Sequence, residues 1–275
     1  MEQGYLIVGL SVLASIVGMG LGSVAAVIFG AGSSRSTNLF LSFAGGVMLA
    51  LVLFELIPEA IEHSGMPIAG LGVIIGVLVV LGFDKLVDKL SEARHAKVNP
   101  DCTDTHESVE ELLHTETPPT AQRNMLRVGI IILCAISLHN IPVGIVMGAA
   151  SHFEITLAVT IGLMLTLHNI PEGMAVSAPL LAGGLSRTRV ILLAFAAGAT
   201  TALGAGVGII TGEMSPIVFA LALSITGGAM LYVVIVEIFP QTIFKRKDRV
   251  QIVLALAGVV SVAVLLLAFS SHHLH

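Results

Sequence analysis

The sequence predicts an all-α, polytopic membrane protein built as one transmembrane domain. Of its 275 residues, 55% are hydrophobic and only 11% are charged, whereas soluble domains carry about 25% charged residues. Several apolar runs are long enough to cross a bilayer as helices, which takes about 20 residues each. The alternating apolar and polar pattern of a barrel strand is absent from the sequence, so we expect helices.

Eight apolar segments are predicted to span the bilayer. Their approximate ranges are 5–30, 38–62, 67–87, 125–150, 154–180, 188–212, 216–243 and 250–270. The N-terminal MEQGYLIVGL has no basic stretch before its apolar run, which favours a retained helix over a cleaved signal peptide. One long polar stretch, 91–124, interrupts the spans. It is acidic, contains Pro118 and Pro119, and is predicted to be largely disordered.

The positive charges predict which side of the membrane each connection faces. All 13 Lys and Arg lie at connections that follow an odd-numbered segment. They are Arg35 after the first; Lys85, Lys89, Arg94, Lys97, Arg123 and Arg127 around the connection after the third; Arg187 and Arg189 after the fifth; and Lys245, Arg246, Lys247 and Arg249 after the seventh. By the positive-inside rule, 91–124 is a cytoplasmic loop and both termini lie outside. The expected location is the cell (plasma) membrane, which in a bacterium is the inner membrane.

A repeat becomes visible when the chain is shifted so that Leu41 aligns with Leu223, which we call the long shift. LSFAGGVMLALVLFELIPEAI (41–61) and LSITGGAMLYVVIVEIFPQTI (223–243) are then identical at ten positions, including Glu55 with Glu237 and the proline that follows each. These two segments cross the membrane in opposite directions, as do the fourth and fifth. We therefore predict two groups of three helices that flank a central pair, an inverted-repeat arrangement typical of secondary transporters.

The central pair carries two similar octets, SLHNIPVG (137–144) and TLHNIPEG (166–173). In the second octet, His168 and Glu172 are four residues apart and share a helix face, while Asn169 offers an amide oxygen. The proline between them lacks an N–H, so it frees a backbone carbonyl and is expected to kink or open the helix. Imidazole, carboxylate and amide ligands suit a divalent ion such as Zn²⁺, Fe²⁺ or Mn²⁺.

The first octet repeats the histidine and the asparagine, at His139 and Asn140, but has Val143 in the place of the carboxylate. Each histidine alone could simply make a hydrogen bond between helices. Two copies on neighbouring helices favour a shared metal site, because ionisable residues at bilayer depth cost roughly 2.5–3.5 kcal/mol to insert and are usually functional.

Further ionisable residues lie within or beside the predicted spans. Glu55 and Glu237 could be metal ligands, path carboxylates, proton acceptors or partners in structural hydrogen bonds. Glu59 and His63, near the outer end of the second span, would gather cations at an entrance or form a solvated helix end. Asp84, at the cytoplasmic boundary, belongs either to an interfacial charge cluster or to an exit path.

The octets resemble those of the ZIP (Zrt/Irt-like) divalent-metal transporters, and the bacterial ZupT- and GufA-like branches look most similar. The resemblance covers nearly the whole chain and includes ELIPEAIEH in the second span. It implies eight spans in a 3+2+3 inverted-repeat fold and import of zinc, iron, manganese or similar ions such as cadmium. It also implies a midplane site between the fourth and fifth helices. Carried over by motif, the metal ligands would be His139, Asn140, His168, Asn169 and Glu172.

This chain departs from the family pattern at two positions. Val143 replaces a glutamate that bridges both ions in family members with two metals. Thr201 lies where the sixth helix of such members often carries a glutamate. We therefore expect a single-ion site built mainly on His139, His168 and Glu172.

The expected function is divalent metal-ion transport, with zinc as the first candidate ion. One alternative is a ZIP-like metal sensor or a carrier of altered specificity. Another is an intramembrane metalloenzyme, although the sequence contains no H-E-x-x-H motif. The expected partners are divalent metal ions and the lipid bilayer, with no nucleic acid, no enzymatic activity and no organic cofactor. A homodimer is compatible with the sequence.

Overall fold

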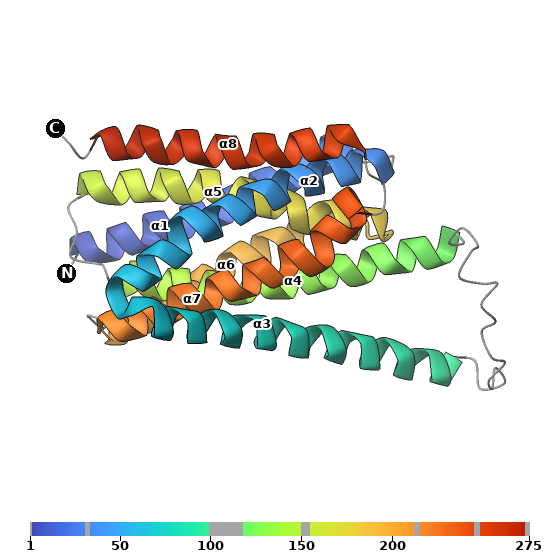
Figure 1. Ribbon diagram of the computed structural model, residues 1–275, viewed down its shortest axis with the longest axis horizontal. Coiled ribbons are helices and arrows are strands. Elements are labelled where there is room, and N and C mark those ends of the chain that lie inside the picture. The colour runs from blue at the N-terminus through green and yellow to red at the C-terminus, as the bar shows by residue number, and fades with distance from the viewer. Residues whose placement is uncertain are drawn as a thin grey trace.

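The computed structural model describes residues 2–30, 34–98, 118–149, 155–211, 215–244 and 248–272, and every regular element in these ranges is helical (Figure 1). The α-helices are α1 (Glu2–Gly30), α2 (Ser34–Leu51), α3 (Ile57–Val98), α4 (Pro118–Ala149), α5 (Ile155–Ala182), α6 (Arg187–Thr211), α7 (Pro216–Tyr232) and α8 (Arg249–His272). Three short π-helical segments are η1 (Val52–Leu56), η3 (Val233–Ile238) and η4 (Pro240–Phe244). The prediction of an all-helical chain is confirmed for the described residues.

Within the described residues, six stretches are long and apolar enough to cross a membrane, in line with a multi-pass membrane protein. One of them, Arg35–Val87, has 53 residues. As a straight helix it would be about 80 Å long, against about 30 Å of hydrocarbon. Gly65 divides it, because its φ of 77° and ψ of 163° are not helical and are accessible to glycine. The predicted segments 38–62 and 67–87 lie on either side of this turn.

Helix α5 is not among these six stretches. The part of α5 whose side chains are described contains the octet TLHNIPEG, and its polar residues lower the hydropathy of that part. The count of eight spans therefore stays a prediction.

The two helices that flank the predicted loop 91–124 are longer than the sequence indicated. Helix α3 continues to Val98, because SEARHAK is rich in good helix formers. Helix α4 begins at Pro118, where a proline needs no N–H partner in the first turn. Residues 99–117 lie outside the described part of the chain, so the predicted disorder of the loop stays a prediction.

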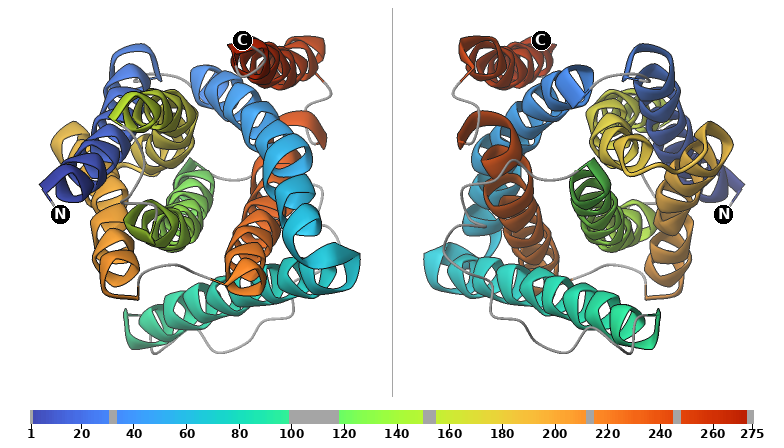
Figure 2. Two further views of the ribbon diagram at one scale, coloured as in Figure 1. Left: turned by 90° about the vertical axis from the view of Figure 1, so that its left-hand side faces the viewer. Right: turned by 90° about the vertical axis from the view of Figure 1, so that its right-hand side faces the viewer.

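The helices pack in two groups that meet along the central pair (Figure 2). In the first group, α1 packs against α5 and α6, and α4 packs against α6 and α5. In the second group, α3 packs against α7, and α2 packs against α8. The groups meet where α2 contacts α5 and where α4 contacts α7. The two octet-bearing helices thus lie inside the bundle, at the boundary between the groups.

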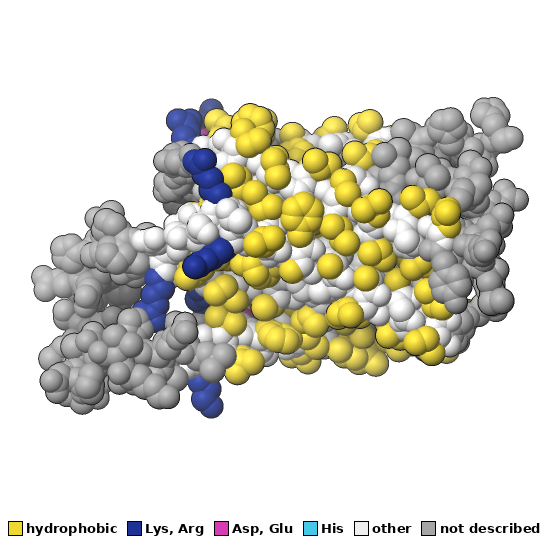
Figure 3. All heavy atoms as spheres, turned by 180° about the vertical axis from the view of Figure 1, so that it is seen from behind, with side chains coloured by type: hydrophobic (Ala, Val, Ile, Leu, Met, Phe, Trp, Pro, Cys, Tyr) yellow, Lys and Arg dark blue, Asp and Glu magenta, His cyan; other side chains and the backbone are white. Residues whose placement is uncertain are grey.

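The surface divides by residue type along the long axis (Figure 3). Hydrophobic side chains are spread over the middle of the face in view, and the visible Lys and Arg gather towards one end. This is the pattern expected of a chain that contacts lipid along its length and presents positive charges on one side of the membrane.

Candidate metal centre

Helices α4 and α5 carry the two octets and remain continuous through them. Pro142 lies inside α4, and Pro171 lies inside α5. Each proline removes only its own backbone hydrogen bond, so the flanking bonds can sustain the helix. The prolines therefore do not end either helix, and the octets face each other from two neighbouring helices.

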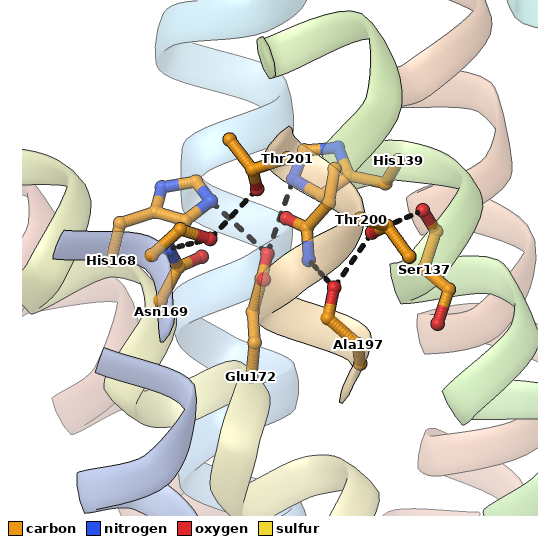
Figure 4. Close-up of polar contacts among 10 residues, drawn as sticks. Ser137, His139, His168, Asn169, Glu172, Ala197, Thr200 and Thr201 are labelled. Atoms are coloured by element: carbon orange, nitrogen blue, oxygen red, sulfur yellow. Dashed lines mark hydrogen bonds and ion pairs between the residues drawn. The ribbon is translucent and has the colours of Figure 1, made fainter. Parts of the chain in front are cut away.

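Three of the five predicted ligands lie close together (Figure 4). The carboxylate atom Oε1 of Glu172 is 3.1 Å from Nε2 of His168 and 3.3 Å from Nε2 of His139. The two imidazole rings stack, with centroids 5.9 Å apart and planes 16° from parallel. One ligand atom from each of the three residues lies within 4.8 Å of the others. We call these three residues the His/Glu cluster.

The His/Glu cluster is buried and leaves polar atoms without partners. Glu172 is 0% exposed and His139 is 2% exposed. Atom Oε2 of Glu172 and Nδ1 of His139 are buried without a hydrogen-bond partner. Leaving such a group unsatisfied costs about 1–3 kcal/mol, and more when it is charged. A divalent cation would satisfy the carboxylate, and two imidazoles with one carboxylate form a ligand set that Zn²⁺ accepts.

The two asparagines are buried beside the cluster, with their amide groups oriented by hydrogen bonds. Nδ2 of Asn140 donates to the carbonyl of Ala197 at 2.9 Å, and Nδ2 of Asn169 donates to Oγ of Ser15 at 3.1 Å. Both amide oxygens, the Oδ1 atoms, are buried without a partner. Because the amide N–H groups are held by α6 and α1, each oxygen is left as an acceptor for another group.

The two positions that depart from the family pattern hold residues without charge. Val143 is half-buried in α4. Thr201 is fully buried in α6, where its hydroxyl and that of Ser15 form a hydrogen bond of 2.8 Å. Sequence reasoning missed Ser15, which links Thr201 to Asn169. Its only signal was a serine within the apolar first segment.

The predicted path residues fall into separate places. Glu55, in η1, interacts electrostatically with His168, and its Oε2 is buried without a partner. Glu59 and His63 are exposed, and Nδ1 of His63 lies 3.0 Å from the carbonyl of Glu59. Glu55 thus lies near the cluster, whereas the other two lie on the surface close to the Gly65 turn.

Asp84 and Glu237 meet a cation that sequence analysis placed at the edge of the loop. Asp84 is buried and forms an ion pair with Arg127, and Nη1 of Arg127 is 3.7 Å from Oε1 of Glu237. The hydroxyl of Tyr232 donates to Asp84 at 2.6 Å. Asp84 thus contacts Arg127 and Tyr232, and Tyr232 is a partner that the sequence pattern did not indicate.

A cavity adjoins the His/Glu cluster between α3, α4 and α7. Its volume is about 140 Å³, and its wall includes His139, Pro142 and Thr226. The hydroxyl of Thr226 is buried without a partner. The cavity is otherwise apolar and lies where the two helix groups face each other.

A helical membrane bundle with a buried cluster of two histidines and one glutamate defines a membrane protein suited to divalent metal ions. The family model described as the ZIP zinc transporter matches residues 4–266 of this chain. The chain therefore belongs to the ZIP family, and the resemblance inferred from the octets is confirmed.

Curated relatives point to the same family. The chain is 29% identical to a zinc transporter ZupT of Chlorobium chlorochromatii, over 91% of this chain and 93% of the relative. It is 31% identical to a zinc transporter ZupT of an Enterobacter species, over 80% of each chain. A zinc transporter ZupT of Escherichia coli is 32% identical over 76% of each chain.

Proposed function

We propose that this protein transports a divalent transition-metal ion, with zinc as the first candidate and iron, manganese and cadmium as others. In this proposal His139, His168 and Glu172 hold the ion, and the amide oxygens of Asn140 and Asn169 complete its coordination. The observation that carries the proposal is the buried, partly unsatisfied His/Glu cluster. Buried ionisable groups of this kind are costly in a membrane and mark ion pathways. The protein acts as a carrier in this proposal, without catalysis.

We propose that one ion is bound at a time. Glu172 is the only carboxylate in the described His/Glu cluster. Val143 and Thr201 provide no negative charge where a second ion would need it. A second divalent ion beside the first would meet strong repulsion, and the His/Glu cluster holds no second carboxylate to offset it.

We propose eight spans in a 3+2+3 inverted repeat, and matched contacts support this. Gly173 of α5 lies against the backbone of Met19, and Gly144 of α4 lies against the backbone of Thr201. The two glycines end the two octets, and the long shift aligns their two partners with each other. The asparagines of the octets make matched hydrogen bonds as well. Asn169 donates to Ser15 and Asn140 donates to Ala197, and the long shift aligns these two acceptor residues with each other.

The second helix group shows matched contacts as well. Gly46 of α2 lies against the backbone of Ala255 in α8, and Gly228 of α7 lies against that of Val73 in α3. The long shift aligns the two glycines with each other and their two partners with each other. These recurring contacts support the proposal that the two halves share one fold.

We propose that the end carrying Lys and Arg faces the cytoplasm, that both termini lie outside, and that ions move inward. Glu59 and His63 would then collect ions outside, and Glu55 would lie between them and the His/Glu cluster. Asp84 and Glu237 would lie on the cytoplasmic side of the cluster. This orientation follows the positive-inside rule, which places the loops rich in Lys and Arg in the cytoplasm.

Metal flux in proteoliposomes tests the proposal. The purified protein is reconstituted with an entrapped zinc-sensitive dye, and His168→Ala with Glu172→Ala is compared with the parent chain. We expect zinc flux to fall by at least about tenfold, since two ligands are lost. The double variant must keep the metal-free thermal stability of the parent within a few degrees. Unchanged flux would contradict the site. A metal-dependent thermal shift without any flux in the parent would favour a sensor.

A further inference from the structure

Among the described residues, a second connected group of charged side chains lies near the Lys/Arg end of the bundle. Asp84 of α3, Arg127 of α4, Tyr232 of α7 and Glu237 of η3 form one connected set, which we call the Arg127 cluster. Arg127 precedes His139 by about three turns of α4, so it lies about 18 Å from the His/Glu cluster along the helix. The transport site itself does not use these contacts.

The Arg127 cluster joins the two helix groups. Arg127 belongs to α4, which packs with α5 and α6, whereas its partners belong to α3, α7 and η3. Both carboxylates are largely buried, with Asp84 at 9% and Glu237 at 3% exposure. Separating a buried ion pair leaves charges without compensation, so the pair resists relative movement of the elements that it joins. A displacement of α4 against α3 and α7 would have to break these contacts.

Among the described residues, the other end of the bundle shows no equivalent arrangement of charges. Glu55 matches Glu237 under the long shift, yet within the described residues it has no Lys or Arg partner, and its Oε2 is unsatisfied. The positions that match Asp84, Tyr232 and Arg127 in the repeats are uncharged: Leu266, Ala50 and Thr156. Two ends that the repeat makes equivalent in backbone therefore differ in their side-chain chemistry. This difference suggests that the Arg127 cluster does more than hold the helices together.

We propose that Arg127 is a latch that ties α4 to α3 and α7 at the Lys/Arg end, and that it must release before an ion can leave the His/Glu cluster by that end. The guanidinium occupies the Asp84–Glu237 carboxylate pair, so a divalent cation on this route has to displace it. The geometry suits arginine, because its planar, permanently charged group can reach two carboxylates at once. The proposal rests on the proposed function in one respect: it assumes that the transported ion leaves by the Lys/Arg end.

Thiol labelling without metal tests the latch separately from transport. Ala229 of α7 lines the cavity beside His139 and is 7% exposed, so Ala229→Cys reports the opening between α4 and α7. The background carries Cys102→Ser and Cys134→Ser. We expect Arg127→Gln to raise the rate of labelling by a membrane-impermeant maleimide by about tenfold. Arg127→Lys keeps the charge and should raise the rate by less than about threefold.

A matched control and a milder variant separate the effect of the Arg127 contacts from a general effect of losing a charge. Arg189→Gln makes the same change at an exposed arginine of α6, and it should leave labelling unchanged. Tyr232→Phe removes only the hydrogen bond to Asp84, preserves the ring, and should raise labelling by about two- to threefold. Labelling that does not change in Arg127→Gln and Tyr232→Phe would overturn the latch. If labelling rises but the parent carries no metal flux, Arg127 still ties α4 to α3 and α7, and the proposed function and the role of the latch in ion release both fail.

Discussion

Glu172 is the residue on which the candidate centre depends, because both histidines approach the same carboxylate oxygen. The sequence could predict its pairing with His168, since residues four apart share a helix face. Its contact with His139 required the further idea that the two octets face each other. The hydrogen bond between the hydroxyls of Ser15 and Thr201 could not be predicted. It joins helices that are distant in the sequence, and it depends on how those helices pack.

Val143 marks the difference between the two octets, and Val143→Glu tests its importance. The new carboxylate would provide the negative charge that a second ion lacks. We expect bound zinc to rise from about one to about two ions per chain, measured by elemental analysis of the purified protein after desalting. Val143→Gln has a similar size without the charge and should stay at one ion. If the glutamate variant also stays at one, the cause of the single-ion site lies elsewhere, and Thr201 is the next position to test.

The helices widen into π-helical turns next to Pro58 and Pro240, the prolines that follow Glu55 and Glu237. The N–H of Ile57 bonds the carbonyl of Val52, and that of Phe239 bonds the carbonyl of Val234, each five residues back. In both cases the next residue is a proline, which cannot donate a bond of its own. The sequence predicted that Glu55 and Glu237 occupy equivalent places. It did not predict the wider turns, because a proline alone can also give a kink.

Close helix packing at the element scale can be tested with two glycines of α6. A Cβ at Gly204 would clash with the backbone carbonyl of Ile141 in α4, whereas a Cβ at Gly206 would meet nothing within 4 Å. We expect Gly204→Ala to lower the free energy of unfolding by about 1–3 kcal/mol through overpacking. This would appear as a lower midpoint of thermal unfolding in detergent.

Gly206→Ala is the matched control on the same helix. It should be neutral or stabilise the protein by up to about 1 kcal/mol, since alanine favours a helix over glycine. Equal losses from both substitutions would mean that the contact with Ile141 does not set the effect, because helix propensity alone favours alanine at both positions.

At the scale of the whole molecule, composition and charge predicted more than local patterns did. Positive charges at alternate connections predicted one basic end, and the structure places the visible Lys and Arg at one end (Figure 3). The long shift predicted two groups of three helices that flank a central pair, and that arrangement stays a prediction. In the packing, α1 lies with α5 and α6, while α3 lies with α7 and α2 with α8. The pairing of Arg127 with Asp84 and Glu237 could not be foreseen, because the sequence cannot tell whether a boundary arginine turns towards water or into the bundle.

Membrane orientation is the property on which inward transport depends, and two exposed positions at opposite ends can establish it. Met66 follows the Gly65 turn and is 71% exposed, and Arg189 is exposed at the start of α6. In the cysteine-free background, we expect Met66→Cys to react with an impermeant maleimide added to intact cells. Arg189→Cys should react only after the cells are permeabilised, because the positive-inside rule places it in the cytoplasm. The reverse pattern would put both termini inside and turn the proposed route around. Labelling of both positions in intact cells would contradict the three spans predicted between them.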